Sequence, residues 1–194
     1  LYRPHPLSWV MGWGRTVIVP SEAVGRHMVD QFGVPPERLR VIPRGVDLNE
    51  FTWRPAPIAA AGAPWRVGMV GRLTGLKGHA VAIQALHQLR RRGVPVILSI
   101  IGDAPAGASK LKDALIDLAA RLEVADAIEW MGMRDDVPQV LATLDVLLAP
   151  SVYPESFGRS LIEAQAVGVP VIASRLGAFP DIIQHEQTGL LVPA

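Results

Sequence analysis

Two loops of the sequence place charged residues next to glycines in a pattern that suits a phosphate ligand. The first loop, residues 71–78, contains Gly71, Arg72 and Lys77. A lysine just before a helix opposes the helix dipole by about 0.3–1 kcal/mol, so a bound anion would explain its presence. Glycine lets the backbone approach a ligand closely, and the two cations could clamp a diphosphate. The alternative is that both cations are solvated surface charges.

The second loop, residues 150–158, carries Glu155 and leads into a helix whose first backbone N–H groups form an anion site. Glu163 lies eight residues beyond Glu155. If every step were helical, the rise would be about 12 Å, so the two carboxylates would hold two ends of an elongated ligand. A nucleotide sugar fits, with its sugar near Glu155, its diphosphate on the helix N-terminus and its ribose on Glu163. The alternative is that both glutamates are ordinary surface acids.

Other kinds of site have little support in the sequence. A third loop, residues 177–181, predicts only a tight turn and a helix start, with Asp181 as a first-turn acid. His79, His87 and His185 stand singly, so we expect no metal site. The sequence contains no Walker A, G-x-G-x-x-G or G-x-S-x-G pattern, which argues against an ATPase, a nicotinamide-dependent enzyme and a serine hydrolase.

Composition narrows the class of protein further. The 194 residues carry 19 Lys plus Arg and 18 Asp plus Glu, and this balance does not suit a dedicated nucleic-acid binder. A hydrophobic share of 49% predicts a folded chain, long enough for one full domain and part of another. Cysteine is absent, which excludes a disulfide framework and is compatible with a reducing compartment. No apolar run reaches the roughly 18–20 residues of a membrane span and no signal peptide is apparent, so we expect a cytoplasmic protein.

From residue 66 onward, short apolar runs alternate with amphipathic stretches, a pattern that predicts an α/β fold with a doubly wound parallel sheet. The expected strands are residues 66–70, 94–101, 127–131, 145–149, 169–173 and 189–192. The expected helices are residues 78–92, 109–122, 136–144, 158–167 and 179–184. Ligands of such sheets bind beyond the carboxyl ends of the strands, and the charged loops described above fall there.

A smaller unit of the same kind precedes this sheet. It comprises an expected strand at 16–19, a helix with Ser21 as N-cap and a second strand at 39–42. Residues 53–64 are rich in Ala and Pro and are interpreted as an interdomain linker. We therefore expect the end of one domain at 1–52 and a second domain at 65–194. Because the chain starts without Met and stops directly after a strand-like run, we also expect it to be truncated at both ends.

Taken together, five motifs resemble glycosyltransferase family four, whose members are retaining enzymes with two Rossmann-like domains (the GT-B fold) and an active site between them. The motifs are Gly71-Arg72 with Lys77-Gly78, residues 102–105, residues 130–132, Pro154-Glu155-Ser156-Phe157-Gly158 with Glu163-Ala164, and residues 177–181. The spacing of Glu155 and Glu163 matches the family's E-x7-E motif. Residues 43–47 resemble its P-N-G-V-D segment, with Arg44 in place of Asn. Ala178 replaces a second glycine of the last motif, and Asp181 stands where Glu is common.

The resemblance implies a donor-binding domain at 65–194 and the end of an acceptor-side domain at 1–52. It implies that Arg72 and Lys77 bind the donor diphosphate, that Glu163 binds the ribose, and that Glu155 lies by the donor sugar; Glu155, Arg72 and Lys77 would be the catalytic residues. The donor-binding residues that it implies are Gly71, Arg72, Lys77, Gly102, Met133, Arg134, Glu155, Ser156, Phe157, Gly158, Arg159, Ser160, Leu161 and Glu163.

The function that the resemblance implies is transfer of a sugar from a nucleotide diphosphate donor to a glycan or lipid-linked acceptor, with retention, in bacterial envelope polysaccharide or lipopolysaccharide synthesis. The phosphate clamp would stabilise the leaving nucleotide while an oxocarbenium-like sugar forms, without a protein nucleophile, cofactor or metal. An aromatic and basic stretch, residues 2–15, could touch the inner face of the membrane. The fragment alone is expected to be inactive in transfer.

Two alternatives stay open at this point. A GT-B-like nucleotide-sugar epimerase would use the same phosphate clamp without an acceptor, and a donor-binding module would bind without turnover. A glycosidase is less expected, because its paired carboxylates should lie about 5–10 Å apart with no phosphate site beside them.

Overall fold

The computed structural model describes residues 6–55, 62–105 and 109–194. These residues form a two-stranded sheet, β1-β2, and a six-stranded sheet in the order β5-β4-β3-β6-β7-β8. All neighbouring strands in both sheets run parallel. The structure therefore confirms the expected α/β fold with a doubly wound parallel sheet.

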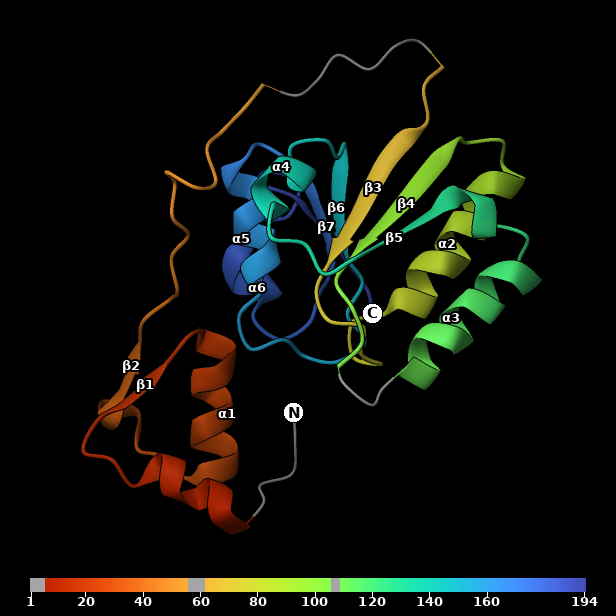
Figure 1. Cartoon of the computed structure of the whole chain (residues 1–194). Helices are drawn as coiled ribbons and strands as arrows, with labels where there is room; N and C mark the ends of the chain where they lie inside the picture. The colour runs from red at the N-terminus through yellow and green to blue at the C-terminus, as the bar shows by residue number, and fades with distance from the viewer. Residues whose placement is uncertain (1–5, 56–61, 106–108) are drawn as a thin grey trace.

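The smaller unit consists of β1 (Val17–Val19), α1 (Glu22–Phe32) and β2 (Leu39–Val41). Ser21 caps α1 as predicted, because its side chain accepts a hydrogen bond of 3.2 Å from the backbone N–H of Val24. Buried apolar side chains of the helix pack against the two strands. Figure 1 shows this unit standing beside α6, at the end of a long connecting segment.

A 3-10 helix, Pro6–Gly12, precedes this unit and was not expected from the sequence. Trp9 on this helix meets Phe32 edge to face, with ring centroids 5.9 Å apart, whereas Trp13 is 76% exposed.

Tyr2 and Arg3, which belong to the stretch predicted to touch a membrane, lie outside the described residues. Among the helices that the structure describes, none has the length and apolar character needed to cross a bilayer. Membrane contact stays a prediction.

The larger sheet confirms all six expected strands, with bounds shifted by one or two residues at most ends. The strands are β3 (Trp65–Val70), β4 (Val96–Ile101), β5 (Ile128–Gly132), β6 (Val146–Ala149), β7 (Val171–Ser174) and β8 (Leu190–Val192). The helices are α2 (His79–Arg91), α3 (Ser109–Arg121), α4 (Val137–Leu141), α5 (Arg159–Ala166) and α6 (Phe179–Ile182).

Helix α4 is shorter than the expected 136–144, and the reason lies at Asp145. The carboxylate of Asp145 accepts a hydrogen bond of 2.7 Å from the backbone N–H of Arg66, and its own N–H donates to the Arg66 carbonyl at 2.8 Å. These bonds align the chain with β3 for the start of β6. The helix must therefore end early enough to leave a turn before Asp145.

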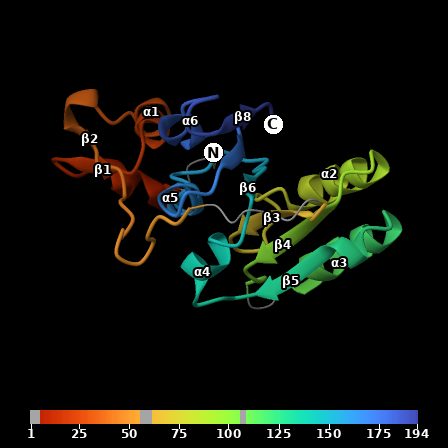
Figure 2. The same ribbon diagram turned by 90° about the horizontal axis from the view of Figure 1, so that it is seen from above.

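The strand order reverses between β3 and β6, because the crossovers after β3 proceed in one direction and those after β6 in the other. Helices α2 and α3 lie side by side on one side of the sheet, and α4, α5 and α6 lie on the other (Figures 1 and 2). Each set of helices covers its own buried apolar cluster. The reversal leaves a crevice at the carboxyl ends of β3 and β6, where open α/β sheets bind their ligands.

The segment between the two sheets packs on the larger one both just before the predicted linker, residues 53–64, and at its start. Phe51 is 7% exposed and belongs to the apolar cluster under α5. The backbone N–H of Arg54 donates to the carbonyl of Val167 at the end of α5, at 3.3 Å. Residues 56–61, the middle of the predicted linker, lie outside the described residues. The bounds of the two domains stay a prediction.

Candidate functional site

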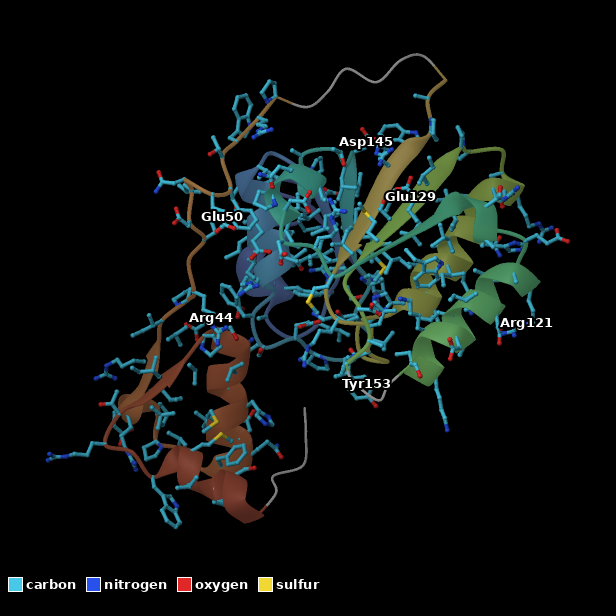
Figure 3. The ribbon with its side chains drawn as sticks, viewed as in Figure 1. Arg44, Glu50, Arg121, Glu129, Asp145 and Tyr153 are labelled. Carbon is cyan, nitrogen blue, oxygen red and sulfur yellow. The ribbon has the colours of Figure 1, made fainter. Side chains whose placement is uncertain are left out.

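A pocket of about 570 Å³ opens at the carboxyl ends of β3 and β6, and we call it the switch-point pocket. Figure 3 shows one of its residues, Tyr153, at this edge of the sheet, while Asp145 lies at the opposite edge. The lining residues are Arg44, Val70, Gly71, Arg72, Thr74, Leu76, Lys77, Tyr153, Pro154, Glu155, Ser156, Phe157, Gly158, Arg159, Ser160 and Glu163.

The structure brings most of the predicted donor-binding residues together around this one pocket. Those that line it are Gly71, Arg72, Lys77, Glu155, Ser156, Phe157, Gly158, Arg159, Ser160 and Glu163. They come from two loops that are far apart in the sequence, after β3 and after β6, and the parallel order of the sheet makes these loops neighbours.

Four other predicted residues are not among those that line the pocket. Leu161 is completely buried in the apolar cluster under α5, so its side chain cannot meet a ligand. Arg134 pairs with Asp136, with 2.6 Å between Nη2 and Oδ2, and Met133 is 80% exposed. Gly102 follows β4 and uses its backbone N–H to bond the end of β5. A donor contact at Gly102, Met133 or Arg134 stays a prediction.

One helix, α5, begins at the pocket and another, α2, begins just after the pocket residue Lys77, both without a side-chain cap. Helix α2 follows Gly78 and α5 follows Gly158, both in the left-handed region with φ of 73° and 99°. A Cβ on Gly78 would lie 1.8 Å from the carbonyl oxygen of Pro150, and one on Gly158 would lie 2.9 Å from the ring of Phe179, so glycine is required at both caps. Because no side chain accepts from the first N–H groups, both helix ends can bind an anion.

An ion pair joins the two loops across the pocket. The ammonium Nζ of Lys77 lies 2.7 Å from Oε1 of Glu155, and the buried hydroxyl of Ser151 donates to the same oxygen at 2.8 Å. The sequence predicted Lys77 at the diphosphate and Glu155 at the sugar, but not that they contact each other. An ammonium has three donors, so Lys77 can hold Glu155 and still donate to a phosphate. Ser151 was missed, although it lies only two residues beyond the end of β6.

Glu163 lies in the interior of the site, on α5. Its side chain is 10% exposed and pairs with the 72% exposed Arg159, with 2.9 Å between Oε1 and Nε. Burial raises the pKa of Glu163 above its ordinary value, the charge of Arg159 opposes this, and the charge of Glu50 adds to it. Figure 3 shows Glu50 on the segment that runs beside α5. Arg159 engages one carboxylate oxygen, which leaves the second available to a hydroxyl donor.

The first turn of α1 contacts the same loop from the smaller unit. The hydroxyl of Ser21 donates to the carbonyl of Ser156 at 2.8 Å, and the backbone N–H of Ala23 donates to Oδ2 of Asp181 at 3.2 Å. Asp181 lies in the first turn of α6, as predicted, but its carboxylate meets α1. The loop that carries Glu155 is therefore held from both units.

Sequence reasoning also missed three polar residues that line the pocket, Arg44, Thr74 and Tyr153. Arg44 was noted only because it replaces an Asn of the family motif, and Figure 3 shows it between α1 and α5. Thr74 and Tyr153 lie in the two site loops, where no local pattern marks their hydroxyls. Over the residues that the structure describes, no three His, Cys, Asp or Glu side chains are grouped so that they could hold a metal ion.

Two family models match this chain. Residues 55–194 match the model for "Glycosyl transferases group 1", and residues 2–50 match the model for "Glycosyltransferase Family 4". The two matches meet close to the segment that joins the smaller unit to the larger sheet.

Curated relatives carry names from different pathways. A D-inositol 3-phosphate glycosyltransferase of Segniliparus rotundus is 31% identical over 97% of this chain and 44% of its own length. A putative colanic acid biosynthesis glycosyltransferase, WcaL of Escherichia coli, is 31% identical over 91% of this chain and 44% of its own length. The chain thus spans less than half the length of these relatives.

Solved structures resemble the chain over nearly all of its length. The Anabaena protein HepE in complex with UDP-glucose matches with a TM-score of 0.85 and 29% identity, over 95% of this chain and 51% of HepE. A glycosyltransferase from Rickettsia africae matches with a TM-score of 0.85 and 25% identity, over 100% of this chain and 54% of its own.

Proposed function

Because the chain belongs to the group 1 glycosyltransferases, we propose that its switch-point pocket binds the nucleotide-sugar donor of a glycosyl transfer reaction. One observation carries this proposal: α5 begins at the pocket without a side-chain cap, α2 begins just after Lys77, and Arg72 and Lys77 line the pocket. Helix N-termini and basic side chains together supply the positive potential that a diphosphate requires.

The two carboxylates of the pocket would bind the other parts of the donor, the ribose and the sugar. Glu163, on α5, would accept from the ribose hydroxyls with the oxygen that Arg159 leaves free, and Glu155, in the loop before α5, would lie at the sugar. The similarity to HepE, which was solved in complex with UDP-glucose, supports a uridine diphosphate sugar as the first donor to test. In this arrangement 65–194 is the donor domain and 1–52 is the end of the acceptor-side domain.

In the transfer itself, the bond between the anomeric carbon and the diphosphate oxygen breaks and negative charge develops on that oxygen. The acceptor hydroxyl forms the new bond to the anomeric carbon, and its proton passes to the leaving diphosphate. Arg72, Lys77 and the α5 N-terminus are placed to stabilise that charge, while the carboxylate of Glu155 would favour the positive, oxocarbenium-like sugar. We propose that the transfer proceeds with retention of configuration, as the family resemblance implies. We also propose a glycan or lipid-linked acceptor of the cell envelope, and the name of the colanic acid relative supports this acceptor.

The test is calorimetric titration of the chain with UDP and UDP-glucose, with and without EDTA. We expect both ligands to bind, with affinities that EDTA leaves unchanged, because side chains and helix N–H groups supply the positive charge. The variant Lys77→Gln should weaken binding by about tenfold, the loss of one charge-assisted hydrogen bond, whereas Lys110→Gln, on the exposed start of α3, should not. Absence of binding, or equal effects of the two variants, would contradict the proposal.

A further inference from the structure

A second, much smaller cavity lies directly behind the switch-point pocket. Its volume of about 20 Å³ suits a single water molecule, which needs about 10–15 Å³ in this measure. Lys77 and Ser160 line both cavities, so the small one adjoins the floor of the large one. The polar side chains around it belong to Lys77, His79, Ser151 and Ser160.

His79 is the residue of this cavity whose role is otherwise unexplained. It is the first residue of α2 and is only 4% exposed. Its ring nitrogen Nδ1 is buried and has no hydrogen-bond partner among the described residues. Buried ring nitrogens are nearly always paired, because leaving one unpaired costs its full desolvation free energy. A hydrogen-bonding partner is therefore expected inside the cavity.

We propose that the small cavity binds one water molecule that joins Nδ1 of His79 to Lys77 and Ser151, and that His79 thereby positions the Lys77–Glu155 ion pair. The water would donate one hydrogen bond to Nδ1 of His79 and accept one from the ammonium of Lys77. With its second O–H the water can donate a hydrogen bond to the hydroxyl oxygen of Ser151, which itself donates to Glu155 and still has free lone pairs. This gives the water three partners, the usual number for a buried water.

The protonation state of His79 agrees with this arrangement. Burial lowers the pKa of His79, a backbone hydrogen bond with Thr74 opposes the shift, and the charge of Lys77 adds to it. Of the residues that line the cavity, from β3, β6, α5 and α6 as well as α2, those that titrate are His79 and Lys77, and Glu155 is one hydrogen bond away. A neutral ring can accept at Nδ1, whereas a protonated ring would donate there and repel Lys77.

The first experiment is independent of any donor and measures the histidine ring by ¹⁵N NMR during a pH titration, with the spectrum of His79→Asn to assign its signals. We expect Nδ1 to be unprotonated and hydrogen-bonded at neutral pH. The variant Lys77→Gln should raise the pKa of His79, because it removes a neighbouring positive charge, and Lys110→Gln should leave it unchanged. An unchanged pKa in Lys77→Gln, or a proton on Nδ1 at neutral pH, would overturn the proposal.

The second experiment rests on the function proposed above and measures UDP affinity by calorimetry. His79→Leu, which cannot hold the water, should weaken UDP binding by about tenfold. His79→Asn keeps a polar atom near the position of Nδ1 and should stay within about twofold of the unsubstituted chain. Leu86→Ala, a buried change on the same helix, should lower the melting temperature without changing the affinity.

The two experiments fail in different ways. If the unsubstituted chain binds no UDP, the proposed function fails, and the NMR titration still decides the role of His79. If UDP binds but His79→Leu and His79→Asn change its affinity equally, the positioning role of His79 is contradicted, whereas the donor site is not.

Discussion

The buried carboxylate of Glu163 provides the sharpest test of the proposed donor site. The variant Glu163→Gln keeps the shape of the side chain and removes its charge. Its partner Arg159 is 72% exposed, so loss of the ion pair leaves the guanidinium in water and not as a buried, unpaired charge. We therefore expect the variant to fold, which allows its binding to be measured.

The expected loss in binding follows from the contact proposed for the ribose. A hydrogen bond to a charged group contributes about 1.5–3 kcal/mol and one between neutral groups about 0.5–1.5 kcal/mol. Because the amide oxygen of Glu163→Gln can still accept, the variant should lose about 1–1.5 kcal/mol, which raises the Kd about 5- to 12-fold. The loss should be the same for UDP and for UDP-glucose, because both carry the ribose. Glu155→Gln should weaken UDP-glucose and leave UDP within about threefold, because its proposed contact is with the sugar. Calorimetric titration of both variants with both ligands measures the four values.

Two outcomes would refute this assignment. Small and equal effects of the two variants would mean that neither glutamate contacts the ligand. A loss of UDP affinity in Glu155→Gln as large as that in Glu163→Gln would mean that the ion pair with Lys77 acts on the diphosphate and not on the sugar.

The raised pKa of Glu163 adds a second measurement on the same variant. Because burial makes the folded state hold this proton more tightly than the unfolded state does, the proton stabilises the fold at low pH. That stabilisation is lost as the pH rises through the raised pKa. Glu163→Gln has no such proton, so its free energy of unfolding relative to the unsubstituted chain should increase as the pH rises from the ordinary pKa of a glutamate, about 4.3, through the raised pKa of the folded state, and then level off. Urea denaturation across this range would contradict the reasoning if the difference stayed flat or fell.

Two further variants test how the pocket is built. Gly158→Ala places a methyl group 2.9 Å from the ring of Phe179 at a φ of 99°, so it should reduce the free energy of unfolding by about 1–3 kcal/mol and weaken UDP binding. If denaturation and titration show that Gly158→Ala leaves stability and UDP binding unchanged, the cap tolerates a side chain and the reasoning is wrong. Ser21→Ala removes the α1 cap and the bond to Ser156, and should cost about 0.5–2 kcal/mol, whereas Ser21→Thr should keep most of both. Equal melting temperatures for these two variants would count against that link.

Much of the fold could be predicted because its elements follow local rules. The strands of the larger sheet are short apolar runs, most fully buried in β4 and β7, and the cap at Ser21 is a local hydrogen bond. Helix α4 shows where such rules end. Its end is set by the bonds between Asp145 and Arg66, which are 79 residues apart, and no local signal in the sequence reveals that contact.

The site was predictable in outline and not in its contacts. Spacing placed Glu155 and Glu163 in one ligand site, and both line the pocket. The bond between Lys77 and Glu155 depends on two loops that meet only in the folded sheet. Leu161 could have been excluded from the sequence, because Leu161 and Ala164 are three residues apart on the apolar face of α5, where both are buried.

Of the three helix N-termini near the pocket, one holds the structure of the site together and two are free to bind a ligand. Helix α1 is capped by a side chain, and that same hydroxyl bonds the carbonyl of Ser156, so its N-terminus is used to hold the loop. Helices α2 and α5 have glycine caps and keep their N–H groups for a ligand. Between them, Oε1 of Glu155 pairs with Lys77, which has two further N–H donors for a phosphate, and the carboxylate lies beside the place proposed for the diphosphate. Such a carboxylate would disfavour bound nucleoside diphosphate and favour a positively charged sugar. It would therefore aid the transition state more than it aids the product.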